Sequence, residues 1–243
     1  MIDYIKNADL LVKSGSHLYG CNVENSDEDL RGFILELPES LLGRQIFNLY
    51  ETKNPDVTIW GLRQFIHLLE VSSPNTLELL WAPKQNILLI TEVGQSIIDN
   101  KNMFISKNLI ARFGGFAHSE WMKAINGSGQ RKLGEQRKEH IAHFGFSVKN
   151  AYHAVRILEE GIELLETGNL TFPRPNADIL KSIRWGKINL TQVTELYEET
   201  EKRFAKAKDL NHIPAKVNKK LIDKLYYEII GTSVCQFLSV QHQ

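Results

Sequence analysis

The strongest constraint on the fold is one change in hydrophobic pattern along the chain. Up to about residue 95, short apolar runs alternate with turn signals, and three of these runs have the length and composition of strands: ADLLVKSG, LRGFILEL and DVTIW. The next run, GLRQFIHLLEV, has apolar residues at helical spacing. Strands that lead into a helix predict a small mixed sheet with flanking helices.

Beyond this point the pattern is helical. KNLIARFGGFAHSEWMKAI predicts one helix, and SVKNAYHAVRILEEGIELLETG predicts another, with Ser147 as its N-cap and Gly168 just past its end. Three further helical segments follow TFPRPN. We therefore predict an α+β chain, with the sheet in residues 1–100 and a helical domain in residues 101–243 that closes a cleft.

Composition narrows the class of protein. The chain has 29 basic and 29 acidic side chains, so it has no general basic surface for nucleic acid, although a local basic patch stays open. Cys21 and Cys235 form neither a metal-ligand spacing nor a disulfide framework, and they fit a reducing compartment. No apolar run approaches the roughly 20 residues that span a bilayer, and the N-terminus lacks signal-peptide features. We expect a cytoplasmic protein without a membrane partner.

The segment SGSHLYGCNVENSDEDLRGF contains the residues with the clearest chemistry. Asp27 and Asp29 are two residues apart, which on a strand points both carboxylates to one face. Two adjacent carboxylates repel each other unless a cation lies between them. Mg²⁺, with Mn²⁺ as the alternative, takes oxygen ligands and leaves positions open for substrate phosphates. Gly15 and Ser16 would form a phosphate cradle, because glycine lets the backbone approach closely and the serine hydroxyl can bind a phosphate oxygen.

A third carboxylate usually completes such a site. Asp56, at the start of the DVTIW strand, is the first choice, because the distance from Asp29 allows the chain to return to the same sheet. Glu78 in NTLELLW is the second choice. It lies in an apolar stretch, where a buried acid needs a partner, so a structural role is favoured for it.

Together these motifs resemble a known family. Gly15-Ser16, a short spacer and then Ser26-Asp27-Glu28-Asp29-Leu30 are similar to the signature of DNA polymerase β superfamily nucleotidyltransferases. Within that superfamily the chain looks closest to the RNA-ligase-associated predicted nucleotidyltransferases, on four further stretches: Asp56-Val57-Thr58, Ser73-Pro74-Asn75, Glu78-Leu79-Leu80 and Gly145-Phe146-Ser147-Val148-Lys149. The resemblance covers most of residues 11–160. His17 stands where minimal members of the superfamily often carry an arginine.

The resemblance implies a reaction and a set of roles. A nucleoside monophosphate would pass from a nucleoside triphosphate, ATP among them, to an acceptor such as an RNA end, with release of pyrophosphate. Asp27, Asp29 and Asp56 would bind two Mg²⁺ ions (or Mn²⁺) and act in catalysis, and Asp56 could also accept the proton. The nucleotide would contact Gly15, Ser16 and Ser26.

Lys149, His153 and Arg156 recur at i, i+4 and i+7, so they share one face of the predicted helix. This cationic stripe could bind the triphosphate or an RNA backbone, or it could be a solvated face. A second basic cluster has the same two interpretations: Arg131, Lys132, Arg137 and Lys138.

Two other functions remain open. The same metal site could modify a protein or a small molecule, and a basic cleft beside the metal would favour RNA instead. Alternatively, the fold could bind a nucleotide without catalysis, which requires at least one of Asp27, Asp29 and Asp56 to point away from the others. The convergence of these three carboxylates therefore separates an enzyme from a binding protein.

Overall fold

The computed structural model describes residues 3–23, 26–36, 40, 47–126, 141, 143–210 and 213–241. The described strands form one mixed sheet in the order β3-β4-β2-β1-β5. Strands β2 and β4 run parallel, whereas the other neighbouring pairs are antiparallel. The strand bounds are Leu10–Lys13 (β1), Asp29–Ile34 (β2), Leu49–Lys53 (β3), Asp56–Gly61 (β4) and Ile87–Ile90 (β5).

The sheet has an inner face that the helices cover and an opposite face with a smaller apolar cluster. On the inner face Phe33 of β2 stacks on Phe65 of helix α3, with ring centroids 4.6 Å apart. Because side chains alternate along a strand, Asp29 and Arg31 lie on the same face as Phe33. The described α-helices that accompany the sheet are short: α1 (Gly15–Tyr19), α3 (Leu62–Glu70), α4 (Pro74–Leu77) and α5 (Glu92–Asp99).

The second half of the chain is helical, as the sequence predicts. Its described helices are α6 (Asn108–Asn126), α8 (Val148–Thr167), α9 (Ala177–Arg184), α10 (Leu190–Ala207) and α11 (Lys219–Gln241). The predicted caps of α8 are confirmed: the Ser147 hydroxyl accepts from the Asn150 amide at 3.5 Å, and Gly168 is left-handed with φ 70°. Helix α10 packs closely on α8, because a Cβ on Gly161 would lie 2.7 Å from the Phe204 ring.

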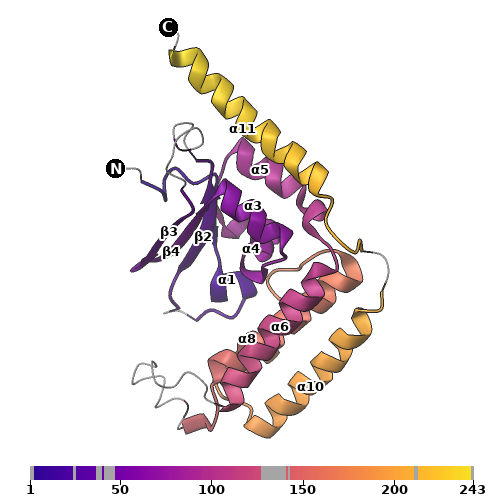
Figure 1. Cartoon of the computed structure of the whole chain (residues 1–243). Helices are drawn as coiled ribbons and strands as arrows, with labels where there is room; N and C mark the ends of the chain where they lie inside the picture. Colours follow the sequence, from indigo (N-terminus) through magenta and orange to yellow (C-terminus); the bar gives the residue numbers. More distant parts are fainter. Residues whose placement is uncertain are drawn as a thin grey trace.

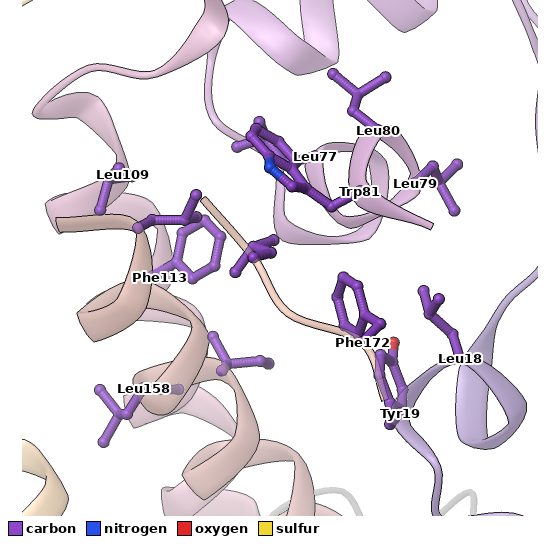
Figure 2. Close-up of a cluster of buried hydrophobic side chains, with 14 of the residues drawn as sticks. Leu18, Tyr19, Leu77, Leu79, Leu80, Trp81, Leu109, Phe113, Leu158 and Phe172 are labelled. Carbon is purple, nitrogen blue, oxygen red and sulfur yellow. The ribbon is translucent and has the colours of Figure 1, made fainter. Parts of the chain in front are cut away.

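One hydrophobic core joins the two halves. Figure 2 shows side chains from both sides of residue 100 packed together, among them Leu18, Trp81, Phe113 and Leu158. Helix α11 then returns to the first half (Figure 1), where Arg63 of α3 donates to the Tyr226 hydroxyl at 3.3 Å. The fold is therefore a mixed sheet with helices on it and a helical C-terminal part, as predicted, while the boundary at residue 100 stays a prediction.

Candidate active site

Asp29 and Asp56 are the first residues of two parallel neighbouring strands. They are partners in the register of β2 and β4, so their side chains leave the sheet side by side. Burial raises the pKa of Asp29 above its usual value, and the charge of Asp56 and a hydrogen bond to its carboxylate raise the pKa further. Arg31 and Lys149 oppose that shift. A shared proton or a bound cation relieves the repulsion between two such neighbouring carboxylates.

The turn after β1 is shaped around Asp29. Gly15 has φ +61°, and a Cβ at this position would overlap the Asp29 carboxylate, 2.8 Å from its Cγ. Glycine is therefore required here both for its backbone conformation and for space. Ser14 ties the two segments together, because its amide and its hydroxyl both donate to the Asp29 carbonyl, at 2.8 and 3.0 Å. Ser14 was not predicted, because no motif distinguishes it.

A cavity of about 530 Å³ opens over this carboxylate pair. This volume is in the usual range for small-molecule sites, about 300–1,000 Å³. The sheet, α1, α6, α8 and α9 all contribute to its wall. The described residues that line it are Gly15, Ser16, Tyr19, Asp27, Asp29, Arg31, Asp56, Asn75, Phe116, Glu120, Lys123, Lys149, Asn150, Tyr152, His153, Arg156 and Arg184.

Asp27 lines the cavity from the segment just before β2, where its side chain is exposed. In the described part of the chain, no three His, Cys, Asp or Glu side chains are grouped so that they could hold a metal ion together. The structure thus brings Asp29 and Asp56 together but does not bring Asp27 into a three-ligand cluster with them. Ser26 is not among the cavity residues named above; its hydroxyl accepts from the Val23 amide at 2.8 Å.

The predicted stripe on α8 faces the cavity, since Lys149, His153 and Arg156 all line it. Among the described residues three further cations line it as well and were not predicted: Arg31 of β2, Lys123 of α6 and Arg184 of α9. Burial lowers the pKa of His153 well below its usual value, and the neighbouring cations, Arg156 first among them, lower it further. His153 is therefore neutral at pH 7 and can donate or accept a hydrogen bond.

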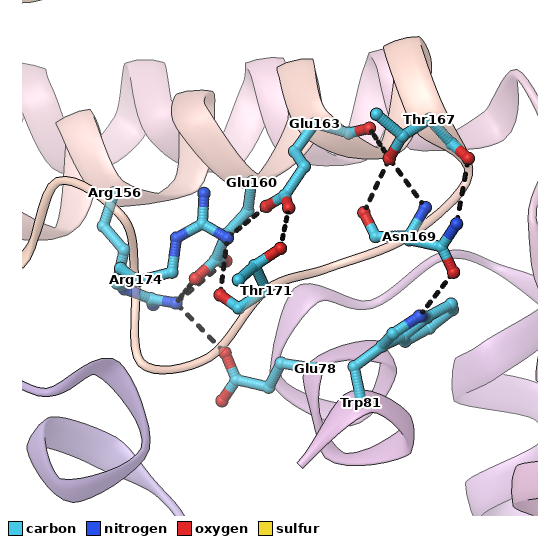
Figure 3. A network of polar contacts seen from close by, with 9 residues as sticks. All are labelled: Glu78, Trp81, Arg156, Glu160, Glu163, Thr167, Asn169, Thr171 and Arg174. Carbon is cyan, nitrogen blue, oxygen red and sulfur yellow. Dashed lines mark hydrogen bonds and ion pairs between the residues drawn. The ribbon is translucent and has the colours of Figure 1, made fainter. Parts of the chain in front are cut away.

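Arg156 also belongs to a buried network (Figure 3). Its guanidinium donates to Glu78 at 3.0 Å and to Glu160 at 2.7 Å, and all three side chains are at most 2% exposed. Glu78 accepts from the Tyr19 hydroxyl too, at 2.8 Å. Glu78 thus has the structural ion pair that its apolar surroundings require. Asp56 is the acid beside Asp29, so the geometry favours Asp56 over Glu78 as a site carboxylate.

Comparison with protein-family models identifies the chain. A model described as RNA repair pathway DNA polymerase beta family matches residues 9–228. The chain belongs to this family. The search of curated proteins and the search of solved structures each found no match.

Membership in the RNA repair pathway DNA polymerase beta family suggests a nucleotidyltransferase role in RNA repair. It agrees with the resemblance found in the motifs, which lie within the matched residues. The second basic cluster, Arg131, Lys132, Arg137 and Lys138, lies outside the described residues. None of the described helices is both long and apolar enough to cross a membrane.

Proposed function

We propose that the chain is a metal-dependent nucleotidyltransferase that moves a nucleoside monophosphate from a nucleoside triphosphate to an RNA end and releases pyrophosphate. One observation carries this proposal most strongly. Asp29 and Asp56 stand side by side at the start of two parallel strands, with Gly15 making room for the Asp29 carboxylate, inside a cavity that several cations line. Paired carboxylates beside a cationic cavity suit a metal-bound triphosphate.

The donor set fits Mg²⁺ in chemical type. Mg²⁺ is usually held by one or two carboxylates together with water and substrate phosphates, so the adjacent pair of Asp29 and Asp56 is sufficient for one ion. Asp27 lines the same cavity and would join them for the second ion. When bound, Mg²⁺ would stabilise charge on the phosphoryl oxygens and lower the pKa of the acceptor hydroxyl.

The chain's own cations would bind the triphosphate. Arg31, Lys149 and Arg184 reach the cavity from three different elements, so they surround a ligand instead of forming one flat patch. Ser16 lies at the glycine turn and would donate its hydroxyl to a phosphate oxygen. Arg156 would act on the triphosphate mainly through its electrostatic field, because Glu78 and Glu160 already occupy one edge of its guanidinium.

Proton transfer from the acceptor would fall to Asp56. Its side chain is exposed, whereas Asp29 is partly buried, so Asp56 is the more accessible base. Neutral His153 would hydrogen-bond the substrate without adding charge. A cationic cavity favours an anionic acceptor such as RNA over a neutral small molecule.

A second candidate is a nucleotide-binding protein without catalysis. It is favoured by the observation that Asp27 does not form a metal-holding group with Asp29 and Asp56. In that case the cavity would bind a triphosphate, and no transfer to any acceptor would follow.

Labelled transfer tests both candidates. The purified protein is incubated with each of the four α-labelled nucleoside triphosphates, Mg²⁺ and a mixed RNA pool, beside Asp29→Asn and Asp56→Asn. Asp99→Asn is the matched control, because Asp99 lies on α5, outside the cavity residues, and accepts from Gln95 at 2.7 Å. The proposal requires label on RNA that both site variants lose and the control keeps. Triphosphate binding without any label transfer would establish the second candidate, and label on protein would replace RNA as the acceptor.

A further inference from the structure

The cavity has a wall that none of the predicted motifs includes. Helix α6 contributes Phe116, Glu120 and Lys123, which recur at i, i+4 and i+7 and so share one face. Phe116 is 39% exposed although it is a large apolar side chain. An exposed aromatic ring in a cavity wall offers a flat surface on which a nucleobase can stack.

Glu120 lies one turn beyond this ring and is only 8% exposed. Two neighbours fix its carboxylate: the Lys123 ammonium donates to Oε1 at 2.6 Å, and the Asn150 amide donates to Oε2 at 2.6 Å. Asn150 is itself held by the Ser147 hydroxyl, which donates to its Oδ1 at 2.6 Å. A carboxylate accepts about four hydrogen bonds, so each oxygen of Glu120 keeps acceptor capacity.

The charge of Glu120 decides which part of a nucleotide it can face. A carboxylate repels phosphate oxygens, and the cations Arg31, Lys149 and Arg184 offer the triphosphate a better place in the same cavity. Lys123 offsets the negative charge of Glu120, so the carboxylate does not disturb a bound triphosphate at a distance. A nucleotide bound in this way would place its uncharged part at Phe116 and Glu120.

We propose that Phe116 and Glu120 form the base-binding part of this site and select guanine. This inference rests on the proposed binding of a nucleoside triphosphate. Guanine stacks on the Phe116 ring, and its N1–H and exocyclic N2–H donate to the two oxygens of Glu120. Among the four RNA bases, guanine alone has two adjacent donors on its Watson–Crick edge; adenine, cytosine and uracil each place an acceptor beside the donor.

Equilibrium binding of GTP, ATP, CTP, UTP and ITP to the full chain tests the inference without requiring turnover. ITP has the guanine ring without the N2 amino group, so it isolates one of the two proposed hydrogen bonds. We expect GTP to bind about tenfold or more tightly than ITP and than the other three, since a hydrogen bond to a charged acceptor is involved. Glu120→Gln should remove this preference, because an amide presents one acceptor and one donor instead of two acceptors.

Glu159→Gln is the matched control. Like Glu120, Glu159 lies on a helix that lines the cavity and has a cationic partner, since Arg203 donates to it at 2.8 Å. Unlike Glu120, it is not among the cavity residues. This control should keep the preference for GTP. Phe116→Ala should weaken binding of all five nucleotides, and Phe116→Tyr should restore it. Thermal unfolding of each variant separates a folding defect from a binding defect.

The outcomes separate the two proposals. Tight binding of all five nucleotides with equal affinity would refute the base preference and leave the triphosphate site standing. Binding of none would refute the nucleotide site and the base preference together. If Glu120→Gln instead changed discrimination between GTP and dGTP and left the preference for GTP over ITP intact, Glu120 would contact the ribose and the inference would be wrong.

Discussion

Replacement of Arg156 by methionine tests the buried network of Figure 3. Glu78 and Glu160 are both 0% exposed, and the variant removes the cation they share, which leaves Glu78 with Arg31, 3.6 Å away. Removing one partner of a buried ion pair costs about 3–5 kcal/mol. We expect the free energy of unfolding to fall by about 4 kcal/mol. For a chain of this size each kcal/mol lowers Tm by about 2–4 °C, so Tm should fall by roughly 8–16 °C.

Urea denaturation measures this loss as a lower midpoint with an unchanged slope. Arg203→Met is the control, because Arg203 is 50% exposed and pairs with Glu159 on the surface, where an ion pair contributes about 0–1 kcal/mol. Arg156→Met/Glu160→Gln should recover part of the lost stability, since one uncompensated charge is then removed. If Arg156→Met and Arg203→Met cost the same within about 1 kcal/mol, the buried network does not stabilise the fold as argued.

The pH dependence of the stability of Arg156→Met gives a second measure of the buried network. Burial raises the pKa of Glu160, and Arg156 opposes that shift, so the pKa rises further in the variant. A carboxyl whose folded pKa exceeds its unfolded value contributes stability at low pH and loses it as pH rises through the folded pKa. The difference between wild type and Arg156→Met should therefore be smallest in acid and increase toward neutral pH.

Three further predictions concern the site. Asp56→Asn should lower the pKa of Asp29, because the substitution removes the neighbouring charge that helps to raise this pKa. Carbon NMR of the Asp29 carboxyl measures the pKa, and an unchanged value would mean that the two acids do not interact. Gly15→Ala should abolish metal-dependent triphosphate binding, as measured by calorimetry. The control Gly115→Ala should bind normally and be about 0.5–1 kcal/mol more stable, because a Cβ at this position meets nothing within 4 Å. Equal triphosphate binding by the two variants would refute the packing of Gly15 on Asp29. His153 should titrate well below pH 6.5 in the free protein by proton NMR, and a bound triphosphate should raise its pKa; a normal pKa in the free protein would show that the cavity is less buried or less cationic than described.

Local sequence signals predicted much of the fold. The helix α8 and its two caps follow from apolar spacing, Ser147 and Gly168, and all of these act within a few residues of one another. Strands β3 and β5 were missed. The side chains of β3 are exposed or half-buried, and Ile87–Ile90 is a short apolar run that periodicity cannot assign to a strand or a helix.

In the candidate site, too, some features followed from local sequence and others only from the tertiary structure. The sequence by itself determined the glycine turn, the acidic motif and the cationic stripe of α8, because each is a short pattern with its own chemistry. Only the tertiary structure placed Asp56 beside Asp29, since that pairing depends on the register of β2 against β4. It also brought Arg31, Arg184, Phe116 and Glu120 to one cavity from three separate elements. Packing across long sequence separations decides such contacts, and no local spacing records them.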